Sequence, residues 1–135
     1  MSGAGLGSAE RIRRRPEFER VYNDGARVSG RFMTVFLLAN GRSGPRLGVA
    51  ATRKLGGAVE RNRAKRLARE IFRRHKIAAG YDIVIVPRRE MLDAPFASLE
   101  ADYDRALERR GDPRSGPRTR PGSRGPRGAG AARGV

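Results

Sequence analysis

The sequence predicts a small α/β sandwich with elements in the order helix, three strands, helix, strand, helix. Apolar and β-branched runs, which are typical of strands, occur at 31–39, 46–52 and 81–86. A helical pattern fills 58–77, between the last two of these runs. Strand, long helix and strand in succession favour a parallel crossover unit within one layered domain. A chain of 135 residues has room for one such domain.

The N-terminal half carries clear boundary signals. A short helix is expected to begin at Pro16 and to end before Gly25, because proline suits the first turn of a helix and glycine the position after its end. The 31–39 strand is followed by the turn-rich segment NGRSGP. An extra short strand at 27–29 fits between the helix and the 31–39 strand.

The C-terminal half supplies one more strand and one more helix. The 81–86 run is almost continuously apolar and ends at Pro87, as expected for a strand that is covered on both faces. The final helix is predicted over 97–110. Its apolar side is formed by Phe96, Leu99, Tyr103, Ala106 and Leu107.

The composition changes abruptly at residue 111. From there to the end the chain has seven Gly, four Pro and six Arg with a single acid, so it cannot bury enough apolar surface to fold. We expect one folded domain over 1–110, with 1–9 flexible, and a disordered basic tail over 111–135. The arginines of the tail either attract RNA or are incidental.

Charge indicates the kind of partner. Thirty Lys and Arg residues against fourteen Asp and Glu give a formal net charge of +16. Such an excess on a small domain favours a polyanion, and nucleic acid is the leading candidate. The absence of cysteine excludes disulfides and thiolate metal sites. No apolar run approaches the ~20 residues that span a membrane, and no signal-peptide core is present, so we expect a cytoplasmic protein without a membrane partner.

The helix predicted over 58–77 has two distinct sides. Its apolar arc consists of Ala64, Leu67, Ala68, Ile71 and Phe72. A basic ridge of Arg61, Lys65, Arg69 and Arg73, with Asn62 and Arg66 beside it, is predicted to lie opposite that arc. The ridge has no acid at i+4 spacing to neutralise it. Because solvated surface helices usually mix both signs of charge, this pattern favours binding to phosphates.

The sequence offers no arrangement for catalysis by the chain itself. A nuclease needs carboxylates or histidines placed for metal binding or proton transfer. Asp102 and Asp104 are two residues apart on the predicted final helix, so they point to different sides. Glu60 and Glu70 flank the ridge singly, and His75, the one histidine, is interpreted as a solvated or helix-capping residue. We therefore expect no catalytic residue and no metal site.

The segment 48–69, GVAATRKLGGAVERNRAKRLAR, resembles the signature of the bacterial ribonuclease P protein family. The signature has a strand ending in a basic pair, a glycine-containing turn, Ala-Val and a dense Arg-Asn-Arg run. The upstream segment PEFERVYNDGARVSGRFMTVF also fits, so the resemblance covers about 10–110. Thr52 and Arg53 stand where Ser and Lys are commoner in the family, and Ala50 where some members have Ser.

The resemblance implies a function and a set of partners. Residues 1–110 would form an RNA-binding domain whose crossover is left-handed, against the usual rule. It would assemble with the catalytic ribonuclease P RNA, without an obligate protein partner, and together they would remove the 5′ leader of precursor tRNA. Mg²⁺ would be the cofactor, held mainly by the RNA. The alternative from another class is a small basic ribosomal or ribosome-associated protein without an enzymatic role.

The resemblance also assigns site residues. RNA contact would fall to Arg53, Lys54, Arg61, Asn62, Arg63, Lys65, Arg66 and Arg69, and leader binding to Phe18, Tyr22 and Phe36. Independently, aromatic side chains beside a basic surface suit unstacked bases. Two alternatives stay open: Phe18 and Tyr22 simply pack the first helix on the sheet, and Arg63, which points away from the ridge, has a local structural role.

Overall fold

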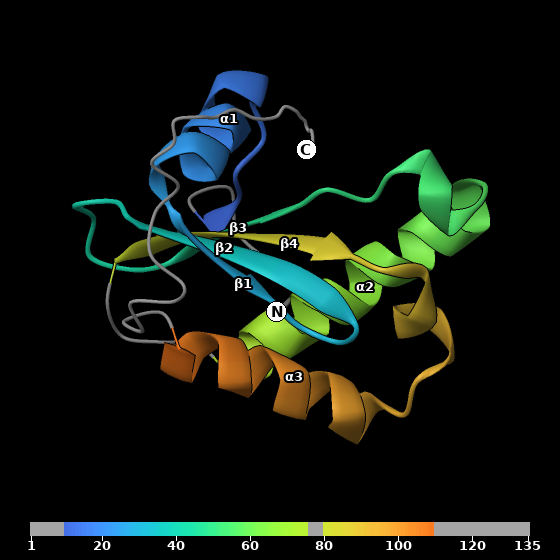
Figure 1. Ribbon diagram of the computed structural model, residues 1–135. Coiled ribbons are helices and arrows are strands. Elements are labelled where there is room, and N and C mark those ends of the chain that lie inside the picture. The colour runs from blue at the N-terminus through green and yellow to red at the C-terminus, as the bar shows by residue number, and fades with distance from the viewer. Residues whose placement is uncertain (1–9, 76–79, 110–135) are drawn as a thin grey trace, which may run out of the picture.

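The fold is built on one four-stranded sheet, seen in a computed structural model that describes residues 10–75 and 80–109 (Figure 1). The strands are β1 (Ala26–Ser29), β2 (Met33–Ala39), β3 (Arg46–Val49) and β4 (Tyr81–Pro87). Their order in the sheet is β1-β2-β4-β3. β1 pairs with β2 and β2 with β4 in antiparallel fashion, and β3 pairs with β4 in parallel. The parallel pair required by a crossover is thereby confirmed.

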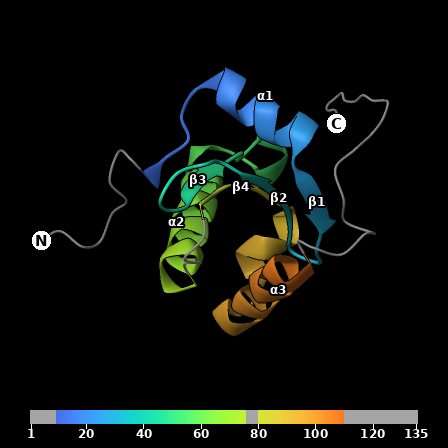
Figure 2. The ribbon, with the colours of Figure 1, turned by 90° about the vertical axis from the view of Figure 1, so that its left-hand side faces the viewer.

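Helices cover both faces of the sheet. They are α1 (Arg15–Asp24), α2 (Ala58–Arg74) and α3 (Phe96–Glu108). Figure 2 shows α1 on one face and α2 with α3 on the other. The predicted small α/β sandwich and its element order are confirmed. Two short 3₁₀ helices, Arg53–Leu55 before α2 and Arg89–Asp93 before α3, were not predicted.

Two strand boundaries differ from the predicted ones. β3 ends at Val49 rather than Thr52, and the Thr52 hydroxyl accepts a hydrogen bond from the Lys54 amide at the start of the following 3₁₀ turn. β4 continues through Pro87, which pairs with Met33. The Ala50 amide still donates to the Ile85 carbonyl at 2.9 Å, and the next bond of this parallel ladder would need an N–H at residue 87, so Pro87 ends the pairing of β3 with β4.

Some predictions lie outside the described residues. These are the flexible 1–9 segment, the end of the long helix beyond residue 75 and the tail over 111–135. They stay predictions, as does the left-handedness of the crossover.

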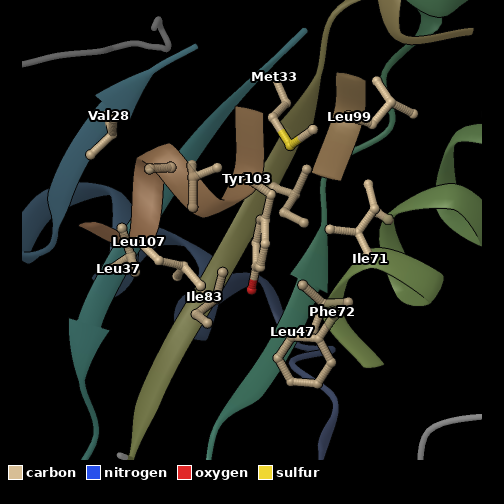
Figure 3. Close-up of a cluster of buried hydrophobic side chains, with 14 of the residues drawn as sticks. Val28, Met33, Leu37, Leu47, Ile71, Phe72, Ile83, Leu99, Tyr103 and Leu107 are labelled. Atoms are coloured by element: carbon tan, nitrogen blue, oxygen red, sulfur yellow. The ribbon is translucent and has the colours of Figure 1, made fainter. Parts of the chain in front are cut away.

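The main core lies between the sheet and the α2–α3 layer (Figure 3). Ile71 and Phe72 from α2 and Leu99 and Tyr103 from α3 are fully buried. They pack with strand residues such as Ile83. The apolar sides predicted for both helices are therefore the sides that face the sheet.

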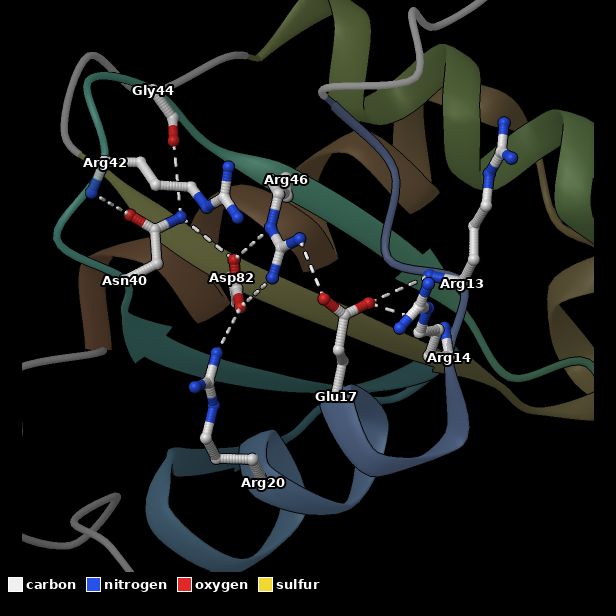
Figure 4. A network of polar contacts seen from close by, with 9 residues as sticks. All are labelled: Arg13, Arg14, Glu17, Arg20, Asn40, Arg42, Gly44, Arg46 and Asp82. Atoms are coloured by element: carbon white, nitrogen blue, oxygen red, sulfur yellow. Dashed lines mark hydrogen bonds and ion pairs between the residues drawn. The ribbon is translucent and has the colours of Figure 1, made fainter.

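A buried polar network joins α1 to the sheet (Figure 4). The Arg46 guanidinium donates to both carboxylate oxygens of Asp82, from Nε at 2.8 Å and from Nη2 at 2.7 Å. Its third nitrogen donates to Glu17 on α1 at 3.2 Å. Asn40 donates to Asp82 at 2.9 Å, and Arg20 of α1 lies 3.6 Å from the same carboxylate. Burial alone would raise the pKa of Asp82, but hydrogen bonds from Arg46 and Asn40 and the charges of Arg46 and Arg20 lower it.

Candidate nucleic-acid interface

A tight turn fixes where α2 begins. Gly56 has φ 128°, a backbone conformation that favours glycine. The Glu60 carboxylate accepts a hydrogen bond from the Gly57 amide at 2.9 Å and so satisfies a free donor at the helix start. Glu60 therefore has a structural role. The turn places Arg53 and Lys54 directly before the helix, on its N-terminal side.

We call the polar side of this region, whose residues are exposed or half-buried, the cationic surface. It consists of Arg53, Lys54, Arg61, Asn62, Arg63, Lys65, Arg66 and Arg69. Within the described part of the chain, none of these side chains forms an ion pair or a hydrogen bond. Val59, beside them on the first turn of α2, is 76% exposed and is the one large apolar side chain that is exposed among the described residues. The sequence interpretation did not single it out, although its place between the turn and the arginine run was visible.

The predicted ridge does not lie opposite the apolar arc. Arg61, Lys65 and Arg69 are half-buried at the edge of the apolar side, and Asn62, Arg63 and Arg66 are the exposed residues. Residues spaced by four advance about 40° around the axis at each step, because a turn takes 3.6 residues. The row therefore starts next to the core at Arg61 and moves toward solvent only further along the helix.

The ridge is also not free of acids. Glu70 forms ion pairs with Arg73, at i+3, and with Arg74, at i+4. The hydrogen bonds from Arg74 and Arg73 lower the pKa of the Glu70 carboxyl. The end of α2 is thus neutralised, and Arg73 does not contribute a free charge.

The aromatic cluster of Phe18, Tyr22 and Phe36 lies on the other face of the sheet, between α1 and β2. The rings of Tyr22 and Phe36 meet edge to face with centroids 4.9 Å apart, and the Phe18 and Tyr22 centroids are 6.4 Å apart. All three side chains are half-buried. Burial raises the pKa of Tyr22 to about 12, so its hydroxyl is neutral at physiological pH. The cluster packs α1 on the sheet and still exposes part of each residue.

Gly48 on β3 makes room for this cluster. A Cβ built there would lie 2.8 Å from the Phe18 ring, closer than van der Waals contact permits. The sequence interpretation missed this residue, although a glycine inside a predicted strand signals a close approach. Ala50, which follows β3, packs against the same cluster, and Arg53 follows three residues later. The end of β3 therefore connects the aromatic cluster to the cationic surface.

His75 is not a solvated residue. Its Nε2 lies 3.0 Å from a Glu100 carboxylate oxygen and its Nδ1 lies 3.0 Å from an Asp104 oxygen. Its backbone amide caps α2 by donating to Ile71, so the capping half of the prediction is confirmed. The ring ties the end of α2 to successive turns of α3.

Asp102 has a structural role. Asp102 accepts hydrogen bonds from the amides of Arg31, at 3.1 Å, and Phe32, at 2.9 Å, and so fixes the β1–β2 turn. Among residues 10–75 and 80–109, no three His, Asp or Glu side chains are grouped to hold a metal ion. No described helix has both the length and the apolar character to cross a membrane.

The fold and these two surfaces define a small basic protein of the nucleic-acid-binding class. The family model described as Ribonuclease P matches residues 6–111. The chain belongs to the ribonuclease P protein family.

Individual relatives agree with this membership. The chain is 42% identical over 106 residues to the ribonuclease P protein component of Symbiobacterium thermophilum, covering 76% of this chain and 92% of the relative. It is 35% identical over 101 residues to that of Caldanaerobacter subterraneus, covering 73% and 87%. The solved RNase P protein from Thermotoga maritima matches with a TM-score of 0.67 at 35% identity, covering 74% of this chain and 96% of that one.

This membership confirms the role expected from the resemblance. The chain is a protein subunit of ribonuclease P, an endoribonuclease of tRNA processing with an RNA partner. The ribosomal alternative is not favoured. The assignment of individual RNA-contacting residues stays a prediction.

Proposed function

We propose that this subunit binds the catalytic RNA through its cationic surface and the 5′ leader of precursor tRNA through its aromatic cluster. It thereby assists the Mg²⁺-dependent removal of the leader, which we expect in the cytoplasm. The observation that carries the proposal is that seven cations of one continuous segment have no acid partner within the described chain. Elsewhere in the same domain, arginines such as Arg46 are ion-paired.

The cationic surface suits the backbone of a structured RNA. With 17 residues, α2 is about 25 Å long and extends past several phosphates. Arginine guanidinium groups bind phosphate oxygens in bidentate fashion, and each contact releases counterions from the RNA. Glu60, in the first turn of α2, does not compete with RNA phosphates for these cations, because its carboxylate accepts a hydrogen bond from the Gly57 amide.

The aromatic cluster suits a single strand. Partly exposed rings allow unstacked bases to stack on them, which contributes ~1–3 kcal/mol per base. The rings are already held by α1 and β2, so little side-chain freedom is lost when a base binds. A leader running past this face would reach Arg53 and Lys54 at the end of β3.

The chain contributes binding rather than bond cleavage in this proposal. Mg²⁺ held by the RNA would supply the chemistry, and the carboxylates of Glu60, Asp82 and Asp102 are engaged in structural hydrogen bonds. We expect the purified chain, treated with nuclease to remove RNA, not to cleave precursor tRNA, and we expect cleavage on addition of the catalytic RNA. Protein-only cleavage that disappears on mutating a carboxylate would contradict this.

The RNA that copurifies with the chain from its natural host tests the partner. A large non-ribosomal RNA in the purified complex supports the proposal. Copurification of ribosomal RNA alone would overturn it.

A further inference from the structure

An open cavity of about 460 Å³ lies where the middle of α2 passes the first turn of α3. It is lined by Arg63, Arg66, Leu67, Glu70, Arg74 and Phe96. α2 and α3 share one face of the sheet, opposite α1 and therefore opposite the aromatic cluster (Figure 2). The cavity adjoins the cationic surface through Arg63 and Arg66 but includes residues that the proposed function does not use.

One wall of the cavity combines an arginine with an aromatic ring. The Arg74 guanidinium carbon lies 5.2 Å from the centre of the Phe96 ring. The Arg74 Nε donates to Glu70 at 2.8 Å, which holds the guanidinium plane in place. Nucleobases that leave a helical stack bind on aromatic rings and on arginine planes. The Arg74 guanidinium lies against the Phe96 ring and is hydrogen-bonded to Glu70, so an arginine plane and an aromatic ring are available in one position.

The other lining residues match the remaining parts of a nucleotide. Arg63 and Arg66 are exposed and have no acid partner within residues 10–75 and 80–109, so their charges are available to a phosphate. Leu67 is half-buried and gives an apolar contact. The Glu70 carboxylate would repel a phosphate placed beside it, but it accepts hydrogen bonds from the exocyclic amino group of a base. An acidic peptide would gain nothing from this carboxylate, which favours RNA.

We propose that the α2–α3 cavity binds one unstacked nucleotide of RNA whose base carries an amino group. The base stacks on Arg74 and faces Glu70, and its phosphate is bound by Arg63 and Arg66. This site is separate from the aromatic cluster. That the nucleotide belongs to the catalytic RNA rests on the proposed function.

Nucleotide titration of the full chain, followed by NMR, tests the site directly. Cytidine 5′-monophosphate, uridine 5′-monophosphate and inorganic phosphate serve as probes. We expect the Phe96 ring and Leu67 methyl signals to shift saturably with the cytidine nucleotide, several-fold more weakly with the uridine nucleotide, and least with phosphate. Equal shifts with all three probes, or none, would overturn the proposal and leave a general electrostatic surface.

The variant Glu70→Ala separates base recognition from charge. It removes the carboxylate acceptor together with its ion pairs to Arg73 and Arg74, while Arg74 keeps the Glu100 carboxylate 3.9 Å away. We expect inorganic phosphate to bind more tightly and the preference for cytidine over uridine nucleotide to disappear. A preference that survives Glu70→Ala would contradict the assigned role of the carboxylate.

The complete ribonucleoprotein tests whether the site serves the catalytic RNA. Phe96→Leu keeps an apolar side chain and removes the aromatic ring against which Arg74 lies. We expect about a tenfold weaker affinity for the RNA. Phe32→Leu is the matched control. Phe32 is also half-buried against the main core, and the Arg31 guanidinium carbon lies 5.3 Å from the centre of its ring, but Phe32 does not line the cavity. This variant should leave the affinity unchanged. Equal losses in both variants would reject the site.

Arg69→Ala, which does not line the cavity, distinguishes the two proposals. If Arg69→Ala weakens RNA binding and folded Phe96→Leu does not, the cavity is not a site for this RNA and the proposed function stands. If neither weakens binding, the proposed RNA contact of the cationic surface is wrong. Should Phe96→Leu fail to fold, the nucleotide titrations on the unmodified chain and on Glu70→Ala decide.

Discussion

Arg46 and Arg66 are the same residue type in opposite surroundings. Arg46 is buried, with two hydrogen bonds to Asp82 and one to Glu17. Arg66 is exposed on the outer side of α2 and has no acid partner among the described residues. The first arginine holds α1 against the sheet, and the second leaves its charge available to a polyanion. The large positive charge of the chain therefore has two components with different physical roles.

Pairing with an acid determines whether a cation stabilises the fold or leaves its charge available to a polyanion. On the α1 side, Glu17, Glu19 and Asp82 pair with Arg46, Arg15 and Arg20. Along α2, the cations up to Arg69 form no ion pair with the described part of the chain, whereas Glu70 neutralises Arg73 and Arg74. Glu70 thus marks the end of the cationic surface.

Replacing Arg46 should give the largest effect. Arg46→Met leaves the fully buried Asp82 carboxylate without its main partner, and we expect a loss of ~3–5 kcal/mol in the free energy of unfolding. Denaturant titration measures this. Arg66→Ala is the control and should unfold like the unmodified chain. Equal stability of the two variants would show that the network does not hold the fold.

The same network predicts a dependence of stability on pH. Its hydrogen bonds and charges place the pKa of Asp82 below the usual 3.8 in the folded protein. A depressed pKa contributes stability that is complete above the unfolded value and is lost as pH falls through the folded one. We expect the melting temperature to drop below about pH 4, and this drop to be smaller in Arg46→Met. A stability that is flat from pH 6 to pH 2 would contradict the assignment.

Replacing Tyr22 should have the next largest effect, confined to leader-bearing substrates. Tyr22→Ala removes a stacking surface, so affinity for precursor tRNA should fall by ~1–3 kcal/mol, and the loss should persist at high salt. Affinity for leaderless tRNA should not change. Because Tyr22 is half-buried, melting curves must first show a folded variant, and Tyr22→Leu serves as the control for packing. If the preference for leader-bearing tRNA is unchanged in a folded variant, the aromatic cluster does not bind the leader.

The sequence predicted the elements well because each is encoded by neighbours in the chain. Alternation and apolar periodicity located the four strands and three helices to within about three residues. The network of Arg46 was out of reach, since its partners lie 29 and 36 residues away in the sequence. The solvated interpretation of His75 was wrong for the same reason, because Glu100 and Asp104 come from another helix.

The cationic surface shows a different limit of sequence reasoning. The residue types were identified from the motif, but their exposure was not, since a row spaced by four winds around the helix. Only the structure places Arg61, Lys65 and Arg69 at the edge of the core. The ion pairs of Glu70 required knowledge of which side-chain conformations are adopted, which spacing alone does not give.

Replacing a single residue of the cationic surface should weaken RNA binding modestly, by an amount that depends on salt. Arg66→Ala removes one phosphate contact, so the slope of log affinity against log salt for the catalytic RNA should decrease by ~1. The effect should shrink as salt is raised. Binding curves at several salt concentrations measure it, and an unchanged slope would mean that Arg66 does not contact a phosphate.

Arg73→Ala should have the smallest effect, and it sharpens the comparison because Arg73 lies on the same helix as Arg66. Its charge is already neutralised by Glu70, so removing it releases no additional counterions on RNA binding. We expect the salt slope to stay within error of that of the unmodified chain, and stability to change little, since exposed ion pairs contribute little to it. The measurement is the same series of binding curves, with Arg66→Ala in parallel. If Arg73→Ala lowers the slope as much as Arg66→Ala does, then the RNA displaces Glu70 from Arg73, and the cationic surface extends to the end of α2.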